Sequence, residues 1–206
     1  MNPLTHALSG WLLAETVPEL GRREKRIVVV AALAPDVDGV GLVAELLTRD
    51  SANPLLWWSE YHHLVAHNLA FAVLTALCAA AVARVSRTTT AALAFVAVHL
   101  HLLGDVAGSR GPDDYQWPIG YLYPFTTSVQ WTWSGQWYLD AWPNIVLTAI
   151  FIAATSALAW RRGYSIVSLF SRAADEKFVG VLRARFGDTA ADSTSSVPAP
   201  PNDTTR

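Results

Sequence analysis

The sequence predicts an all-α protein: an up-and-down helical bundle that crosses a membrane several times, followed by a disordered C-terminal tail. Three observations lead to this fold class. Hydrophobic residues make up 52% of the 206 residues and charged residues only 16%, well below the roughly 25% charged residues of an ordinary soluble domain. The apolar residues gather in five long segments without the alternation of a strand. The basic residues between these segments fall mainly on one side of the expected topology.

Each of the five apolar segments is expected to form a helix. The first, 4–19, is short, and the second, 27–47, is interrupted by the sequence APDVDGVG. The third, 64–83, has the length that a bilayer requires, about 20 apolar residues with a range of roughly 17–25. The fourth and fifth, 90–106 and 144–160, are near the lower limit of that range.

The C-terminal part of the chain changes in character twice. Residues 164–186 have an apolar face with scattered basic residues, which is typical of an amphipathic helix that packs on its own domain or binds a membrane surface. Residues 187–206 are small, polar and proline-bearing, and they are expected to be disordered. The predicted organisation is therefore a helical membrane domain over 1–163, an amphipathic helix over 164–186 and a tail over 187–206.

Composition also excludes some classes of function. The net charge of −2 gives no indication of a nucleic-acid partner. The only cysteine, Cys78, excludes a disulfide framework and a thiolate metal site, and it is expected to be a small core residue.

The basic residues serve as a probe of topology. If each apolar segment crosses once, the basic clusters between segments one and two, between three and four, and after five all lie on one side. Only Arg49 and Arg110 lie on the other side. The positive-inside rule then predicts that the basic side and the tail are cytoplasmic. The clustered residues are Arg22, Arg23, Lys25, Arg26, Arg84, Arg87, Arg161 and Arg162.

Histidines and carboxylates gather at the opposite, non-cytoplasmic end on the same topology. Carboxylates inside apolar segments are costly and are functional candidates by default. Imidazole together with carboxylate suits zinc, manganese or iron, and the number of groups is sufficient for one or two ions. The candidate metal ligands are His6, Asp36, Asp38, His62, His63, His67, His101 and Asp105.

The spacing of these residues supports a shared site. His63 and His67 share a face if their helix begins by residue 62, and His101 and Asp105 have the same i, i+4 spacing. The proline and glycine of APDVDG indicate a break from which both aspartates point inward. His99 is two residues from His101, so it faces away and is structural or supports a ligand.

The tryptophan-rich segment 108–142 holds five of the nine tryptophans. It is expected either to cover a site or to lie among lipid headgroups, where Trp and Tyr concentrate.

Four short motifs resemble the bacterial family of membrane-bound metal-dependent hydrolases that includes the LexA-regulated inner-membrane protein YdjM. They are THALSG at 5–10, APDVDG at 34–39, HHLVAHN at 62–68 and HLHLLGD at 99–105. The third motif of the family usually reads His-Arg-Gly-x-Thr-His-Ser. Here His63 replaces the arginine and Asn68 the serine, which leaves open whether His62 or His63 is the ligand.

The resemblance implies a function for these residues. The family is similar to zinc-dependent phospholipase C in how its motifs supply histidine and aspartate ligands. This similarity implies hydrolysis of a phosphoester or lipid-like substrate through a metal-activated water. Zinc is the expected cofactor, with manganese or iron as alternatives, in one or two ions. The expected catalytic residues are Asp38, which orients the water, and Arg110, which either holds an anionic group or marks the membrane surface. The expected partners are the bilayer of the bacterial inner membrane and a small-molecule or lipid-like substrate.

Two other functions use the same residues. A haem-binding membrane protein would ligate iron through histidines on neighbouring helices, but this function leaves the three aspartates unexplained. A protein that binds or transports a divalent metal, without hydrolase activity, would need a site near the midplane that is reachable from both faces. The gathering of the ligands at one end favours the hydrolase.

Overall fold

The computed structural model describes residues 1–111 and 115–187, and in these ranges it contains helices and no strand. The prediction of an all-α protein is confirmed. Met1–Ala153 forms one compact unit, and a second unit begins at Ala154, within the last long helix. The tail predicted at 187–206 lies, apart from Gly187, outside the described residues.

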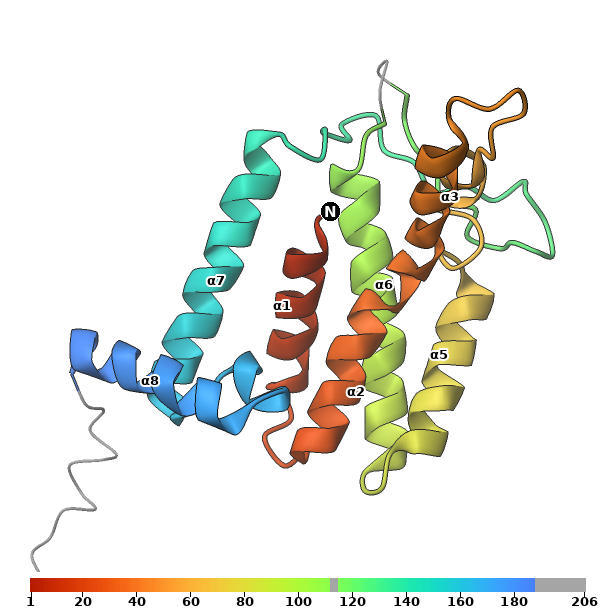
Figure 1. The fold of residues 1–206 in the computed structure, drawn as a ribbon. Helices are drawn as coiled ribbons and strands as arrows, with labels where there is room; N and C mark the ends of the chain where they lie inside the picture. Colours follow the sequence, from red (N-terminus) through yellow and green to blue (C-terminus); the bar gives the residue numbers. More distant parts are fainter. Residues whose placement is uncertain (112–114, 188–206) are drawn as a thin grey trace, which may run out of the picture. The chain divides into compact units, whose positions relative to one another are not determined.

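Four helices form the body of the first unit (Figure 1). They are α1 (Pro3–Ala14), α2 (Arg22–Leu33), α5 (Leu69–Val82) and α6 (Arg87–Gly108). Helix α2 packs against α1 on one side and against α6 on the other, and α5 packs against α6. The N-terminal ends of α1 and α5 lie at the same end of the bundle as the C-terminal ends of α2 and α6. Residues from four separate parts of the chain therefore meet at that end.

The chain between α2 and α5 contains three short elements: the 3₁₀-helix η1 (Ala34–Val40), α3 (Gly41–Thr48) and α4 (Trp57–Tyr61). The break predicted at APDVDG is present, in the form of this tighter 3₁₀-helix. Pro35 lies in its first turn, where a residue without a backbone N–H is tolerated but does not continue the α-helical pattern before it.

His63 and His67 would share a helix face only if their helix began by residue 62, and this condition is not met, because α5 begins at Leu69. Asn68 is the reason. Its side chain accepts a hydrogen bond from the Phe71 amide (2.8 Å) and donates one to the Leu64 carbonyl (2.7 Å). An asparagine at this position satisfies an amide that the first helical turn leaves unpaired. Residues 62–68 form a loop instead, in which His63 has a φ of 70°.

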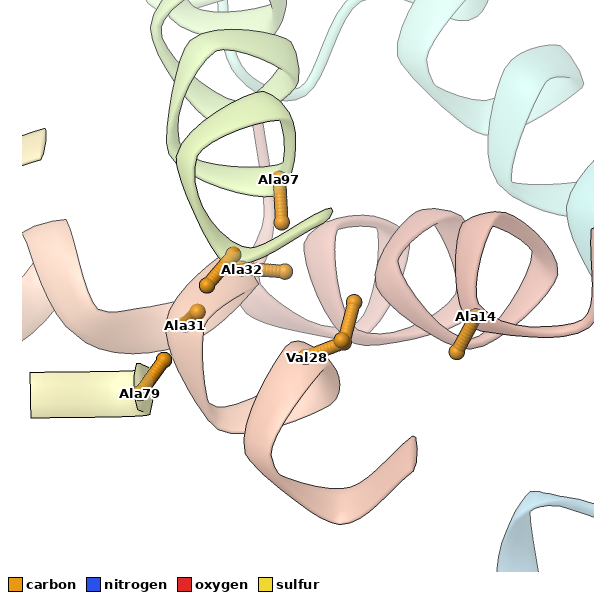
Figure 2. Packing of buried hydrophobic residues seen from close by; sticks show 7 residues of the cluster. Ala14, Val28, Ala31, Ala32, Ala79 and Ala97 are labelled. Carbon is orange, nitrogen blue, oxygen red and sulfur yellow. The ribbon is translucent and has the colours of Figure 1, made fainter. Parts of the chain in front are cut away.

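Small residues form the contact between α1, α2, α5 and α6 (Figure 2). A Cβ atom added at Gly10 of α1 would lie 2.6 Å from the Ala32 Cβ atom of α2. Small residues at such positions let helix backbones approach closely, which is how membrane helices associate. The buried residues of this cluster are Ala14, Val28, Ala31, Ala32, Ala79, Ala94 and Ala97.

Among the residues that the structure describes, three helical stretches are long and apolar enough to cross a membrane: Arg22–Thr48, Arg87–Gly108 and Trp142–Arg162, the last of which is α7. Helix α5 is apolar but shorter. Helix α1 has 12 residues and so rises about 18 Å, against roughly 30 Å of hydrocarbon in a bilayer. The expectation of five crossing segments is therefore reduced to three candidates.

Large apolar side chains cover the outside of the helices. Leu77 of α5 is 64% exposed and Ile145 of α7 is 64% exposed, a pattern typical of a lipid-facing surface. Cys78 is also exposed, so its expected place in the core is wrong. Both faces of α5 are apolar, and the sequence pattern therefore could not distinguish the inner face from the outer one.

The second unit contains the 3₁₀-helix η3 (Ile166–Leu169) and α8 (Arg172–Phe186). The helix predicted at 164–186 is thus two helices. Buried Asp175 joins them, because its Oδ1 accepts hydrogen bonds from the amide (2.8 Å) and hydroxyl (2.5 Å) of Ser165.

Candidate metal centre

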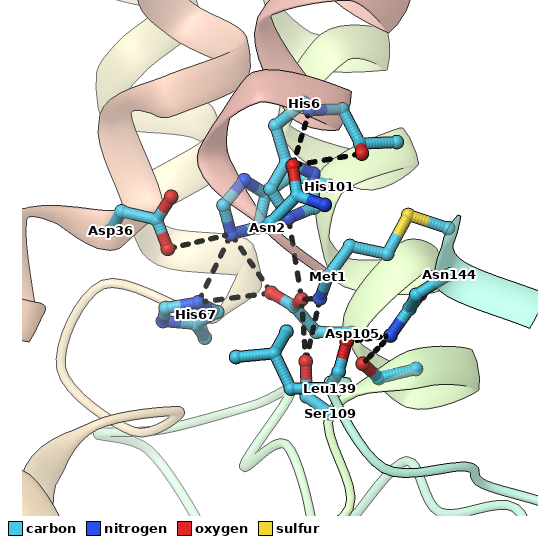
Figure 3. Close-up of polar contacts among 12 residues, drawn as sticks. Met1, Asn2, His6, Asp36, His67, His101, Asp105, Ser109, Leu139 and Asn144 are labelled. Carbon is cyan, nitrogen blue, oxygen red and sulfur yellow. Dashed lines mark hydrogen bonds and ion pairs between the residues drawn. The ribbon is translucent and has the colours of Figure 1, made fainter. Parts of the chain in front are cut away.

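One group of four side chains has the composition of a metal site (Figure 3). Asp36 comes from η1, His67 from the loop before α5, and His101 and Asp105 from the last turns of α6. Each offers one ligand atom, and these atoms all lie within 4.8 Å of one another. Four of the predicted ligands are therefore brought together from three parts of the chain.

The distances within this group match those between the ligands of one ion. His101 Nε2 lies 2.9 Å from Asp105 Oδ2, 3.2 Å from His67 Nε2 and 3.6 Å from Asp36 Oδ1. In a tetrahedral zinc site with bonds of about 2.0–2.1 Å, the ligand atoms are roughly 3.3 Å apart. The observed spacings fall around that value, so the residues fit a single divalent ion.

Hydrogen bonds fix which nitrogen each imidazole presents to this group. The Nδ1–H of His101 donates to the Ala32 carbonyl of α2 (2.8 Å), and the Nδ1–H of His67 donates to Asp38 Oδ2 (2.9 Å). In both rings Nε2 then faces the group, and it is the atom that would bind an ion after losing any proton it carries. Partners of this kind orient metal-binding histidines and raise their basicity.

Asp38 is close to the group, but both of its oxygens are engaged elsewhere. Oδ1 faces His62 Nδ1 (2.6 Å), and Oδ2 accepts from His67 Nδ1 and from the Ala66 amide (3.1 Å). Asp38 thus connects η1 to the loop at 62–68 and orients two histidines. Its predicted roles as a ligand and as a catalytic residue stay predictions.

His6 lies against the group from the side of α1. Its ring stacks on that of His101 with centroids 3.7 Å apart, and its Nε2 is 3.3 Å from Asp105 Oδ1. This nitrogen is buried and makes no hydrogen bond within the described part of the chain. Asp105 Oδ1 also contacts the ammonium group of Met1 and accepts from Ser109 Oγ (2.9 Å). A positive charge thus already faces this carboxylate.

His62 and His63 form a second candidate group together with His67. His62 stacks on Trp58 (3.8 Å between centroids), and the Nδ1 of His63 is buried without a hydrogen bond among residues 1–111 and 115–187. The structure therefore places both histidines near His67. The two alternatives from the sequence, His62 or His63 as the ligand, both stand.

The electrostatics of this loop, which lies outside the candidate spans, favour a positive charge at His67, on the ring itself when no metal ion is bound. Burial opposes charging of the His67 imidazole, but hydrogen bonds to Asp105 and Asp38 outweigh it and raise its pKa to about 9. Burial lowers the pKa of His63 well below its usual range. His63 is therefore a neutral imidazole at pH 7, the form that binds metals.

A cavity of about 360 Å³ leads to the centre. Asp36, Asp105 and both His62 and His63 line it, together with Arg110. Two donors of the Arg110 guanidinium are held by loop carbonyls, with Nη2 donating to Ser134 (2.8 Å) and Nε to Gln136. The predicted catalytic arginine is thus in the wall of the cavity.

The tryptophan-rich segment covers this cavity. Trp117 packs against His63 (4.6 Å between ring centroids) and lies edge-on to Trp58 (5.4 Å). Gln136 holds the segment in place, because its side chain donates to the Asp105 carbonyl (2.9 Å) and accepts from the Trp117 amide (3.0 Å). Sequence reasoning did not single out these three residues. The excess of tryptophan was the available signal.

His99 lies in neither group. Its Nδ1–H donates to the Phe95 carbonyl (2.8 Å), and its Nε2 is 3.0 Å from the Tyr121 hydroxyl. It therefore attaches α6 to the covering segment, which fits the structural role that the sequence left open.

Comparison with known proteins adds a family. Neither a curated protein nor a solved structure matches the chain. The family model described as YdjM inner membrane protein matches residues 1–179, a range that includes all eight candidate ligands. The chain therefore belongs to the YdjM family of inner membrane proteins.

Proposed function

We propose that this protein is a membrane-bound, metal-dependent hydrolase that acts on a phosphoester or lipid-like substrate. One observation carries the proposal: the group formed by Asp36, His67, His101 and Asp105 meets a cavity, which its two carboxylates line. A purely structural cluster of buried carboxylates and imidazoles would have no need of an access route.

The donor set favours zinc, with manganese or iron as alternatives. Two imidazoles and two carboxylates are ligands for borderline or hard divalent ions, and no thiolate is present among the four. The buried Nε2 of His6 and the pair His62 and His63 offer further nitrogen donors beside them. These would serve a second ion or a fifth ligand.

The chemistry divides between the ion and the chain. A divalent ion held there would supply Lewis acidity, which activates water and polarises a phosphoryl oxygen. Hydrolysis adds one water across a P–O bond: the hydroxyl group goes to phosphorus and the proton to the leaving oxygen. Asp38 and the Ala32 carbonyl hold the imidazoles in one orientation, so that no reorganisation is needed during the reaction.

The surrounding residues suit an anionic substrate. Arg110 brings a fixed positive charge into the wall of the cavity, and a guanidinium favours phosphate oxygens. Trp58 and Trp117 narrow the entrance beside His62 and His63. They would reduce the access of bulk water and so strengthen the electrostatic interactions in the site.

Metal content tests the centre. We expect purified wild type to contain about one equivalent of a divalent metal or more, and Asp105→Ala and His67→Ala to contain at least about tenfold less. His99→Ala is the matched control, since it removes a histidine of α6 that belongs to neither group. Equal metal content in all four proteins, measured by mass spectrometry of the metal, would contradict the centre.

Hydrolysis tests the reaction. We expect the metal-loaded protein to cleave bis(4-nitrophenyl) phosphate or a phospholipid, to lose activity on chelation and to regain it when zinc is restored. Stoichiometric metal without hydrolysis of either substrate would contradict the hydrolase, and would instead favour a protein that binds or transports the metal.

A further inference from the structure

A second cavity of the first unit adjoins the metal centre. It has a volume of about 490 Å³ and lies between α1, α6 and the part of α7 that belongs to this unit. Its size is within the range of small-molecule sites. Its lining is predominantly apolar, from residues that include Leu12, Leu13, Leu100, Leu103, Leu147 and Phe151. We call this cavity the α1–α6–α7 groove.

The groove meets the centre at its polar end. His6, whose buried Nε2 faces Asp105 Oδ1 at 3.3 Å, lines the groove. Met1 lines both the groove and the cavity of the metal centre. From His6 to Leu13 the groove follows α1 for seven residues, or about 10 Å. The two cavities therefore adjoin each other at Met1.

Glycine lets Met1 and His6 pack closely on α6 where the two cavities adjoin. A Cβ atom added at Gly104 would lie 3.1 Å from Met1 Sδ and 3.2 Å from His6 Cε1. Any larger side chain at this position of α6 would press on both residues, at the place where the two cavities meet.

The side of the groove is open to the surface of the bundle. Leu100 and Leu103 of α6 line it and are 40% and 55% exposed. In a membrane this surface faces acyl chains, so a lipid tail enters without leaving the hydrocarbon. Trp137 also lines the groove, and its Nε1–H is buried without a hydrogen bond in the described part of the chain. An ester carbonyl is an acceptor of suitable polarity for it.

We propose that the substrate is a phospholipid whose phosphoester lies at the metal centre and whose acyl chain lies in the α1–α6–α7 groove. This inference rests on the proposed function and specifies its substrate. A tail gains little hydrophobic free energy on moving from bilayer to groove, since both are apolar. The groove therefore acts by orienting the phosphoester towards the ligands, which is a contribution to rate more than to affinity.

A substitution that fills the groove tests the inference. We expect Leu103→Trp to lower the cleavage of a long-chain phosphatidylglycerol in nanodiscs at least about tenfold, while metal content and cleavage of water-soluble bis(4-nitrophenyl) phosphate stay within about twofold. The matched control is Leu74→Trp on α5, because Leu74 is also 55% exposed and does not line the groove.

Three outcomes distinguish the hypotheses. Unchanged cleavage of the lipid by Leu103→Trp overturns the groove, and so does an equal loss on both substrates. Absence of cleavage of either substrate by the wild type contradicts the proposed function instead.

Photocrosslinking tests whether an acyl chain lies in the groove even if the wild type cleaves neither substrate. Phosphatidylglycerol with a diazirine in its acyl chain should label Leu147 and Phe151 in the wild type and in Leu74→Trp. In Leu103→Trp this labelling should fall several-fold relative to the outward-facing Ile145 and Ile150. An unchanged ratio in Leu103→Trp would overturn the inference.

Discussion

Asp38 shows how one residue can set the chemistry of others. A carboxylate only accepts hydrogen bonds, so its contacts with His62 and His67 require both rings to carry their proton on Nδ1. The Nε2 atoms are then available as ligands. His101 reaches the same state through a different partner, the backbone carbonyl of Ala32. The centre is therefore organised by groups that do not belong to the group of four.

The first prediction concerns this orienting role. Asp38→Asn should leave the protein folded but weaken metal binding by about 10–100-fold, the usual effect of losing an outer partner of a ligand. An amide has one acceptor oxygen in place of two, so one of the two histidines loses its partner. Competition with a chromogenic chelator measures the affinity.

Asp50→Asn is the control for Asp38→Asn, because the Asp50 side chain is 90% exposed and forms an ion pair with its neighbour Arg49. An affinity of Asp38→Asn equal to that of this control would contradict the orienting role. Complete loss of metal at saturating concentration would show instead that Asp38 is itself a ligand.

At the scale of elements, the centre depends on interruptions of helices. Helix α2 ends in η1, which carries Asp36 and Asp38, and the loop at 62–68 carries His67 before α5 begins. A regular helix would have turned successive polar residues to different sides. Only α6 contributes ligands from an uninterrupted helix, and there His101 and Asp105 have the i, i+4 spacing that brings them together.

The second prediction concerns the close approach of α1 and α2. Gly10→Ala places a methyl group 2.6 Å from the Ala32 Cβ atom, and overpacking of this kind usually costs about 1–3 kcal/mol. Because the Ala32 carbonyl holds His101, we expect metal affinity to fall along with thermal stability in detergent.

Gly180→Ala provides the comparison for Gly10→Ala. Nothing lies within 4 Å of the position of its Cβ atom in α8, so there alanine should stabilise by about 0.5–1 kcal/mol through helix propensity. A Gly10→Ala protein that is as stable as wild type would show that α1 and α2 can separate at little cost.

At the scale of the whole molecule, the basic clusters still indicate how the protein is oriented in the membrane, but Lys25 no longer counts among them. Lys25, counted in the first basic cluster, is buried in an ion pair with Glu15 (2.8 Å). Its charge is therefore compensated, while five arginines remain in the two clusters of the first unit, namely Arg22, Arg23, Arg26, Arg84 and Arg87. From the positive-inside rule we expect the end of the first unit opposite the metal centre to face the cytoplasm.

The third prediction tests that orientation. In a Cys78→Ala background, Ser51→Cys at the end of the metal centre should react with a membrane-impermeant maleimide in intact bacterial cells. Val85→Cys, in the connection between α5 and α6, should react only after permeabilisation. Both positions are exposed, so accessibility on the protein does not explain a difference. The reverse pattern of labelling would place the centre in the cytoplasm.

The sequence by itself determined the class of fold, the break after α2 and the pair His101 and Asp105. Each of these follows from local spacing, because residues a few positions apart are neighbours on any helix. The polar residues inside apolar segments could also be recognised from the sequence. Such residues cost free energy in a membrane, and they therefore indicated the position of the centre.

Only the tertiary structure decided which groups converge and what orients them. The contact of His67 with His101 spans 34 positions, and that of His101 with the Ala32 carbonyl spans 69. Such contacts depend on how helices pack, which no local period specifies. The exposure of Cys78 and the α1–α6–α7 groove could not be predicted either. These helices are apolar on several faces, so the sequence pattern cannot show which face meets a neighbouring helix and which meets lipid.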